Sequence, residues 1–464
     1  MWKKGEITVF VSLLLAVLLF LLEACLWSAR HAFARSQTEE ALELAEASVL
    51  SEYHRELLER YDLFYVDLGY GTGREDTEYL KQRLRWFLKE NLPKNSEAAL
   101  EVWDFSRASD ERGMAYYEQA VSHEKQATGA AFLERLLYCK ELAGTAEDSY
   151  EAYSEAEGRE QKNLEELRRR REEVEEIHTP DPVSATEALK GGSILHLVLE
   201  DPGKVSGKKA DLNEAPSVRT CLEGTGPRGI YKGNLGNDLF FHAYLMEHLF
   251  HAVEFLAEDQ EEEPWLNYQL EYLIVGENTD IANLEGVCKR ILLMREGMNY
   301  AYLQTDSAKK AECEALALLM VGATMIPGLV EAVKQVLMLA WAFGESVMDV
   351  RILLSGKKCA FYKGAGRWRT SLSGALDLQN TISGVDAGED DQGLTYEDYL
   401  GILLVATGRE KKTMRSLDVI EGVIRGLSGN NGFYVDQCTD SFRLRTVIRN
   451  ERELTAERSF CYEW

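Results

Sequence analysis

The sequence is short of basic residues relative to acidic ones. Its 464 residues include 52 Lys and Arg against 78 Asp and Glu, a formal net charge of −26 at pH 7. A nucleic-acid groove needs a basic face to neutralise phosphates, so this shortage argues against a nucleic-acid partner. Aromatic residues make up 10% and charged residues 28%, which excludes a wholly disordered chain. The composition is that of an acidic, folded protein.

Short motifs that carry catalysis are also missing. The chain has no Cys-x-x-Cys pair, no Gly-x-Ser-x-Gly elbow, no P-loop, and no Ser-x-x-Lys accompanied by Ser-Asp-Asn and Lys-Thr-Gly. Gly69, Gly71 and Gly73 have the spacing of a phosphate loop, but no α/β unit follows them, and we interpret them as a turn. We therefore expect no enzymatic activity, and we assign no catalytic, cofactor-binding or metal-binding residue.

A long apolar run is present near the N-terminus. Residues 7–22 are almost wholly apolar, and residues 24–27 extend them. Together they give about 20 residues of helix, which is enough for the roughly 30 Å of a bilayer core. Lys3 and Lys4 precede the run and, by the positive-inside rule, place the N-terminus in the cytoplasm. The sequence predicts a single-pass anchor with the bulk of the chain outside the cytoplasm.

Three processing patterns compete with a retained anchor. Residues 22–25 have the outline of a lipoprotein box, although Glu23 is unusual at its position. Residues 32–34 resemble a signal-peptidase site, but they lie well beyond the apolar run. Cleavage after Gly5 would fit the prepilin outline, although Phe10 stands where pilins carry Glu. We expect the span to be uncleaved.

The fold class predicted is α+β, predominantly helical, with an N-terminal transmembrane helix that continues to about residue 61 and a mixed ectodomain with short strands. Apolar spacing predicts further helices at about 77–92, 110–126, 127–177, 237–257, 280–304, 306–322, 328–354 and 411–427. Predicted strands lie at 100–109, 193–200, 268–275, 357–363, 433–438, 442–449 and 459–464. Thr395, with Asp398 three residues on, predicts a capped helix start.

The chain divides by composition into four parts. Residues 1–27 form the cytoplasmic tip and transmembrane anchor, and residues 28–177 form a helical region. Residues 178–238 hold five of the eight prolines and are predicted to be a connecting region. Residues 239–464 are predicted to be a core domain of helices and strands.

The predicted helix 328–354 has a strongly apolar centre and invites interpretation as a second membrane span. Glu331, Lys334, Glu345 and Asp349 lie along it, however. Charges recur there too often for a lipid-facing segment. We interpret it as a buried core helix.

The sharpest candidate for a metal site lies on the predicted helix 237–257. His248 and His251 are three residues apart and Glu247 and His251 are four apart, so these residues would share a helix face. The zincin pattern is absent, and the helix, which also carries His242 and Glu254, is rich in aromatic residues. We interpret these histidines as core residues.

Two further features have open or ordinary interpretations. Residues 386–391 form an acidic loop, but glycine and acidic residues do not fall at EF-hand positions, and we interpret it as solvated.

Seven cysteines follow the span, and some of them could pair in an oxidising compartment. Cys288 and Cys313 lie on predicted helices and are expected in the core.

Several segments together resemble an uncharacterised family of single-pass membrane proteins of Gram-positive bacteria, encoded beside tight-adherence (Tad) pilus genes. The similar segments are 4–10, 28–30, 61–71, 267–276, 292–309, 339–351 and 394–404. The resemblance implies a Tad-associated surface or pilus-assembly component, similar in layout to the TadE/TadG-like pseudopilins. Its expected partners are the membrane and pilus-assembly or other envelope proteins.

The family offers no catalytic residue to carry over. Two alternatives stay open: a membrane-tethered binding module for a peptide, glycan or cation, and a metal-dependent hydrolase built on the histidine-bearing helix.

Overall fold

The chain folds into two compact units in the computed structural model. The model describes residues 4–74, 77–92, 97–127, 129–172, 193–226, 235–257, 261, 263–322, 325, 328–378, 388, 390, 392–449 and 453–462. Unit 1 comprises Met1–Glu111, Cys221–Ile230 and Ser428–Trp464, and unit 2 comprises Arg112–Thr220 and Tyr231–Leu427. Helices dominate and strands are few, which confirms the predicted α+β class.

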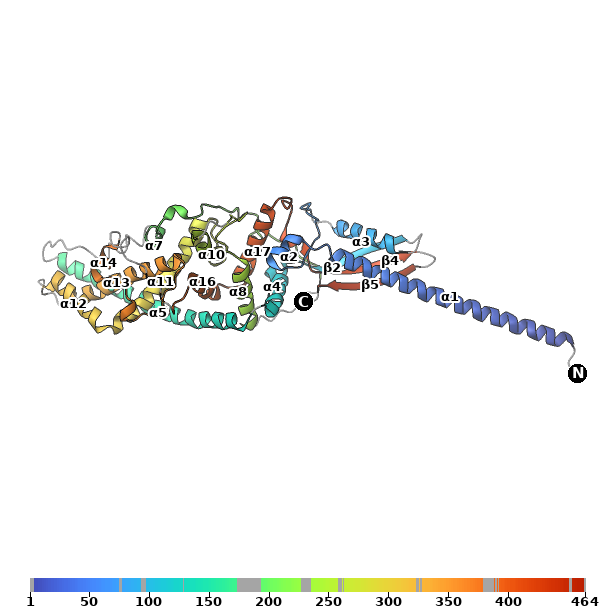
Figure 1. Ribbon diagram of the computed structural model, residues 1–464, viewed down its shortest axis with the longest axis horizontal. Coiled ribbons are helices and arrows are strands. Elements are labelled where there is room, and N and C mark those ends of the chain that lie inside the picture. Colours follow the sequence, from blue (N-terminus) through green and yellow to red (C-terminus); the bar gives the residue numbers. More distant parts are fainter. Residues whose placement is uncertain are drawn as a thin grey trace. The chain divides into compact units, whose positions relative to one another are not determined.

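Unit 1 is built on the N-terminal helix and a small antiparallel sheet (Figure 1). Strand β4 lies between β2 and β5, so the C-terminal end of the chain completes a sheet that a strand near residue 100 begins. The elements are α1 (Lys4–Leu50), α2 (Arg55–Tyr61), β1 (Val66–Asp67), α3 (Thr77–Asn91), β2 (Glu97–Ser106), η5 (Val435–Gln437), β3 (Cys438–Thr439), β4 (Ser441–Arg449) and β5 (Glu453–Cys461).

Alternation of side chains along β4 explains why one face of this sheet is covered. Phe442, Leu444 and Ile448 are buried, whereas Arg443 and Arg445 between them are exposed. Successive side chains of a strand point to opposite faces, so these three apolar residues gather on one side. Helices α1 and α3 supply the residues that cover that side, and the cluster includes Leu42, Ala45, Val49, Leu80, Leu84 and Leu88.

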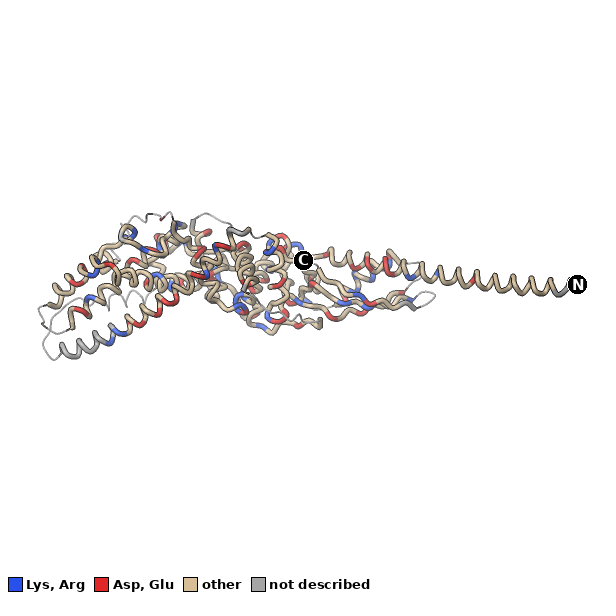
Figure 2. The backbone as a smooth tube through the Cα atoms, turned by 90° about the horizontal axis from the view of Figure 1, so that it is seen from below, with Lys and Arg blue, Asp and Glu red and all other residues tan. Residues whose placement is uncertain are grey.

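Helix α1 has two halves of different character. The large apolar side chains from Ile7 to Trp27 are 49–72% exposed, whereas Leu42, Ala45 and Val49 are buried. Charged residues are sparse along the first half and frequent along the second (Figure 2). The first half of α1 therefore exposes an almost wholly apolar surface, as membrane-spanning helices do. The second half is amphipathic and packs its apolar face against the core of unit 1.

The predicted continuation of this helix to residue 61 is wrong in one respect, because two helices cover the region. Helix α1 ends at Leu50, and α2 starts at Arg55. The amide of His54 donates to the carbonyl of Tyr65 at 2.8 Å, and its ring Nδ1 accepts from the amide of Leu57. His54 thus caps a new helix, and a side-chain cap of this kind fixes a helix start.

Unit 2 is a helical assembly around α13 (Leu329–Leu354). The other elements are α4 (Asp110–Ala127), which leads into the unit, α5 (Ala130–Glu172), α7 (Leu195–Val198), η1 (Pro202–Lys204), α8 (Leu235–His248), α9 (Ala252–Ala257), α10 (Gln269–Val275), α11 (Asp280–Thr305), α12 (Ser307–Val321), η3 (Ala365–Arg367), α14 (Leu372–Leu376), α16 (Tyr396–Ala406) and α17 (Arg409–Gly426). Helix α13 packs on α5, α11, α12 and α14. It is buried along nearly its whole length, which confirms that it is a core helix.

The remaining predicted helices and caps are largely confirmed. Helices α3, α4, α11, α12 and α17 and strands β2 and β4 lie where the sequence places them, and α5 covers residues 130–172 of the predicted 127–177. The capping box at the start of α16 is present, because the side chain of Thr395 accepts from the amide of Asp398 and the Asp398 side chain accepts in return. Strand β5 starts earlier than predicted, at Glu453.

Several predictions are wrong in unit 2. Residues 268–275 form helix α10 and residues 195–198 form helix α7 where strands were predicted. Between 357 and 363 an isolated bridge from Cys359 to Leu394 replaces a strand. In unit 1, the strand predicted at 433–438 is also wrong in large part, because residues 435–437 form the 3-10 turn η5 and only Cys438 belongs to a strand, β3. A buried apolar run carries no periodicity that separates strand from helix, and this explains the errors at α7 and α10.

Candidate functional site

The histidines considered above as a candidate metal site, and interpreted as core residues, do not all lie on the single helix predicted at 237–257. Helix α8 ends at His248, and His251 lies in the connection before α9. The His248 ring lies 4.3 Å from that of Tyr244, and His251 Nε2 lies 3.5 Å from a carboxylate oxygen of Glu254. Burial lowers the pKa of His251 to about 4, so its imidazole is neutral at pH 7.

His242 is a core residue of unit 2. Its imidazole meets the ammonium of Lys412, which also donates to the carbonyl of Leu404 at 3.2 Å. Burial lowers the pKa of His242 to about 3 and that of Lys412 to about 8. A neutral imidazole can accept from an ammonium, so the contact gives the Lys412 ammonium and the Nε2 of His242 a buried partner each. The sequence interpretation of His242 as a core residue is confirmed.

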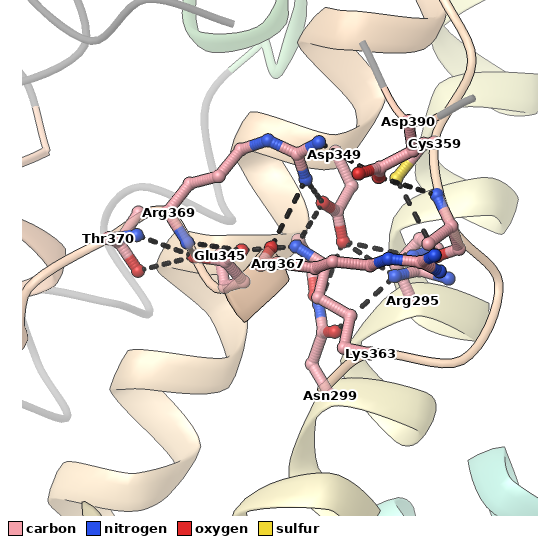
Figure 3. A network of polar contacts seen from close by, with 12 residues as sticks. Arg295, Asn299, Glu345, Asp349, Cys359, Lys363, Arg367, Arg369, Thr370 and Asp390 are labelled. Carbon is pink, nitrogen blue, oxygen red and sulfur yellow. Dashed lines mark hydrogen bonds and ion pairs between the residues drawn. The ribbon is translucent and has the colours of Figure 1, made fainter. Parts of the chain in front are cut away.

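The densest polar arrangement in unit 2 is a network of buried charges (Figure 3). Helix α11 contributes Arg295 and Asn299, and α13 contributes Glu345 and Asp349. The segment that follows α13, here called the strap and comprising residues 357–371, contributes Cys359, Lys363, Arg369 and Thr370. Asp390 reaches the network from further along the chain.

Asp349 is the centre of this network. Its carboxylate accepts from Arg295 Nε at 2.9 Å and from Asn299 Nδ2 at 3.0 Å, and the Lys363 ammonium lies 2.6 Å away. The guanidinium of Arg369 is 3.6 Å away. Burial by itself would raise the pKa of Asp349, but Arg295 and Lys363 outweigh it and hold that pKa well below its usual range.

Glu345 ties the strap to α13. Its carboxylate accepts from the amide and from the hydroxyl of Thr370, both at 2.7 Å, and from the amide of Arg369 at 3.0 Å. The ammonium of Lys363 contacts the same carboxylate. A carboxylate that receives several donors is well satisfied despite full burial.

The charges of the network balance. Arg295, Lys363 and Arg369 supply three positive charges, against three negative charges from Glu345, Asp349 and Asp390. The Arg295 guanidinium also donates to the carbonyl of Phe361 at 2.7 Å, which holds a second point of the strap. Buried charges persist in proteins when they are paired and hydrogen-bonded, as they are here.

This chemistry suits a clamp better than a reacting centre. Arg295 and Lys363 hold the pKa of Asp349 well below neutral, so this central carboxylate is not poised to exchange a proton at pH 7. Burial raises the pKa of Cys359 to about 12, so its thiol is a poor nucleophile at pH 7. The described contacts fasten the strap to α11 and α13.

The other buried thiols are similar. Cys288 and Cys313 are fully buried free thiols, which confirms their predicted place in the core. Burial raises the pKa of Cys139 and of Cys313 to about 12. Thiols of this kind behave as small apolar side chains.

The acidic loop lies mostly outside the described residues. Of residues 386–391, only Gly388 and Asp390 are described. Asp390 accepts from Arg369 at 2.8 Å and from the amide of Ala360 at 2.8 Å. The described acid of this loop is therefore held by a cation of the network rather than solvated alone.

Sequence reasoning found two members of the network without their partners. Glu345 and Asp349 were recognised as charges on a core helix, but residues 357–363 of the strap were predicted to be a strand. A signal was present in Arg295, a charge inside the apolar run of α11, because a charge at a core position needs a buried counter-charge. Which residues supply it depends on contacts between distant segments.

Helix α1 is the second feature with functional meaning. Among the described residues it is the one helix long and apolar enough to cross a membrane, and its apolar window is wholly exposed. A single membrane span and a signal sequence share this property. By its length and composition, α1 is therefore a candidate for either of these.

Comparison with known proteins gives a family without an assigned activity. No curated protein and no solved structure matches the chain. Residues 172–450, which are more than half of the chain, match a family of unknown function, DUF5702. The chain therefore belongs to the DUF5702 family of unknown function.

Proposed function

We propose that this protein is a membrane-anchored extracytoplasmic structural or assembly component, pseudopilin-like, of a Tad-type pilus or a related cell-surface system. In this proposal the chain is a single-pass protein of the cell membrane with its N-terminus in the cytoplasm. It acts as a scaffold rather than as an enzyme, and the buried charges of unit 2 serve its fold.

The observation that carries the proposal is the continuity of α1. One helix runs without interruption from Lys4 to Leu50. Its residues 7–27 span about 30 Å at 1.5 Å per residue, close to the thickness of a bilayer core. The same helix then packs on the sheet of unit 1 through Leu42, Ala45 and Val49.

A continuous helix transmits position and force between membrane and ectodomain. A flexible linker would let an enzyme or a binding module diffuse near the membrane, whereas a helix packed on a sheet fixes the direction in which unit 1 leaves the span. A subunit that must stack with neighbours in an envelope assembly needs that fixed direction. The proposed partners are pilus-assembly or other envelope proteins.

A pull-down from membranes tests the proposal. The tagged full-length chain is compared with a chain lacking residues 1–27 and with a chain in which residues 7–27 are replaced by an unrelated apolar helix. We expect pilus-assembly subunits to be retrieved with the full-length chain and to be lost on deletion.

The replacement separates two roles of the span. Retrieval by the replaced chain would show that the span serves as an anchor, and loss would show that its sequence is a recognition surface. If no envelope protein is retrieved by any of the three chains, the assembly proposal is wrong.

A further inference from the structure

A buried carboxyl group lies on α1 where the helix meets the sheet of unit 1. Glu46 is 0% exposed, and neither of its carboxylate oxygens has a hydrogen-bond partner among the described residues. It is flanked on the helix by Leu42, Ala45 and Val49, which belong to the apolar cluster between helix and sheet. A polar group in such a place is costly unless it is uncharged.

The sheet offers Glu46 little compensation. Thr446 of β4 is also fully buried, and its hydroxyl has no hydrogen-bond partner among the described residues. The nearest cation is Arg458 of β5, whose Nη1 lies 4.0 Å from Glu46 and 3.8 Å from Glu43. One partly exposed guanidinium is therefore shared between two carboxylates.

Within the part of unit 1 that the structure describes, the other elements packed here add no cation close to Glu46. Helix α3 turns Leu80, Leu84 and Leu88 toward α1, and its Arg83 donates instead to Glu52, at 3.0 Å. The charged groups that act on Glu46 are therefore Arg458, which favours the ionised form, and Glu43, which disfavours it. Burial is the largest influence and raises the pKa of Glu46 to about 8.

We propose that Glu46 is a proton-controlled lock between the anchor helix and the sheet of unit 1. Protonated, the carboxyl group fits the apolar layer, and α1 is held on the sheet. Ionised, it demands water, and the second half of α1 loosens from β4 and β5. The proposal rests on the proposed function, in which this helix joins the membrane to the ectodomain, and it adds a way to regulate that joint.

The direction of the effect follows from the pKa values. Unfolded or detached, Glu46 has an ordinary pKa near 4.5, whereas packed on the sheet its pKa is about 8. The packed state therefore binds the proton more tightly throughout that interval. Its stability is greatest below pH 4.5, falls as the pH rises toward 8 and then levels off.

Local hydrogen exchange of the full-length protein in detergent tests the lock. After correction for the intrinsic rate of exchange, we expect protection of the amides of residues 41–50 to fall between about pH 5.5 and about pH 7.5, by up to about tenfold per pH unit. Glu46→Gln, which cannot ionise, should remove this fall. Glu43→Gln, on the same helix but exposed, should keep it.

A second variant, with an apolar side chain at residue 46, keeps the test valid if Glu46→Gln does not fold. Glu46→Leu suits the apolar layer, and we expect it to raise protection at about pH 7.5 and to leave it independent of pH over the same interval. Protection that does not change with pH in the wild type, or that falls equally in the wild type and in Glu46→Leu, would overturn the proposal. This readout needs no partner, so failure of the pull-down and failure of the lock are separate results.

Discussion

Asp349 holds together segments of unit 2 that are far apart in the chain. It binds Arg295 and Asn299 of α11 and Lys363 of the strap, all in a fully buried setting. Asp349→Asn removes one of three negative charges and leaves three cations. We expect it to lower the free energy of unfolding by roughly 3–5 kcal/mol, because an uncompensated charge stays buried.

Glu331→Gln is the matched control for that substitution. Glu331 lies on the same helix, but its side chain is 60% exposed, beside Lys334. Exposed ion pairs contribute about 1 kcal/mol or less. Chemical denaturation of both variants measures the two effects. An equal loss of unfolding free energy in the two variants would show that the buried network contributes no more than an exposed ion pair.

Because Lys412 is buried, we expect the protein to become more stable as the pH rises above about 8. Burial lowers its pKa to about 8, below the ordinary 10.5 that it has when unfolded. Between these values the folded state releases the proton first, so stability increases with pH across that interval. Lys412→Met should remove the rise and Lys411→Met, a neighbouring exposed residue, should keep it. Thermal unfolding across the interval measures this, and a rise that survives Lys412→Met contradicts the assignment.

At this scale the sequence indicates which residues are unusual but not what they touch. Glu345 and Asp349 stand out as charges on an apolar helix. Lys363 and Arg369 do not, because they follow in a segment with no regular period. Glu46 lies four residues after Leu42 and three before Val49, so its spacing places a charge on the apolar face of α1. It is buried only because the C-terminal strands supply the layer beneath it.

Two helical glycines of unit 2 should respond in opposite ways to replacement by alanine. A Cβ at Gly422 of α17 would lie 2.5 Å from the indole of Trp265, whereas a Cβ at Gly144 of α5 meets nothing within 4 Å. Alanine favours a helix over glycine by about 1 kcal/mol. Gly144→Ala should therefore stabilise the protein by roughly that amount, and Gly422→Ala should destabilise it despite the same intrinsic gain.

Melting temperatures of the two glycine variants test the contrast. Shifts in opposite directions are expected. A rise for both would mean that Trp265 moves aside without cost, and a fall for both would mean that α5 has an unrecognised neighbour at Gly144.

Periodicity predicted the long helices well because each has one continuous buried face. It failed at α10, where residues 268–274 are all buried and no polar side marks the period. It also missed the break between α1 and α2, which depends on the contact of His54 with Tyr65. Elements whose limits depend on a tertiary contact are not readable from local spacing.

Truncation of the chain at its C-terminal side should affect the folds of the two units differently. Unit 1 needs β4 and β5, which follow residue 440, whereas unit 2 is complete at Leu427. A chain ending after residue 427 should lose the fold of unit 1 and keep that of unit 2. Limited proteolysis is expected to degrade residues 28–111 and to cut within 221–230, while residues 112–220 and 231–427 of unit 2 persist, and loss of both units would show that unit 2 depends on unit 1.

During synthesis, helix α1 is made long before the strands of unit 1 that cover it. Helix α1 leaves the ribosome about 390 residues before β4, which at 5–20 residues per second is a delay of roughly 20–80 seconds. Throughout that delay Leu42, Ala45 and Val49 have no strands to cover them. In the proposed function, α1 would therefore lie in the membrane long before the sheet on which it packs is complete, because β4 and β5 are made after all the other elements of that sheet.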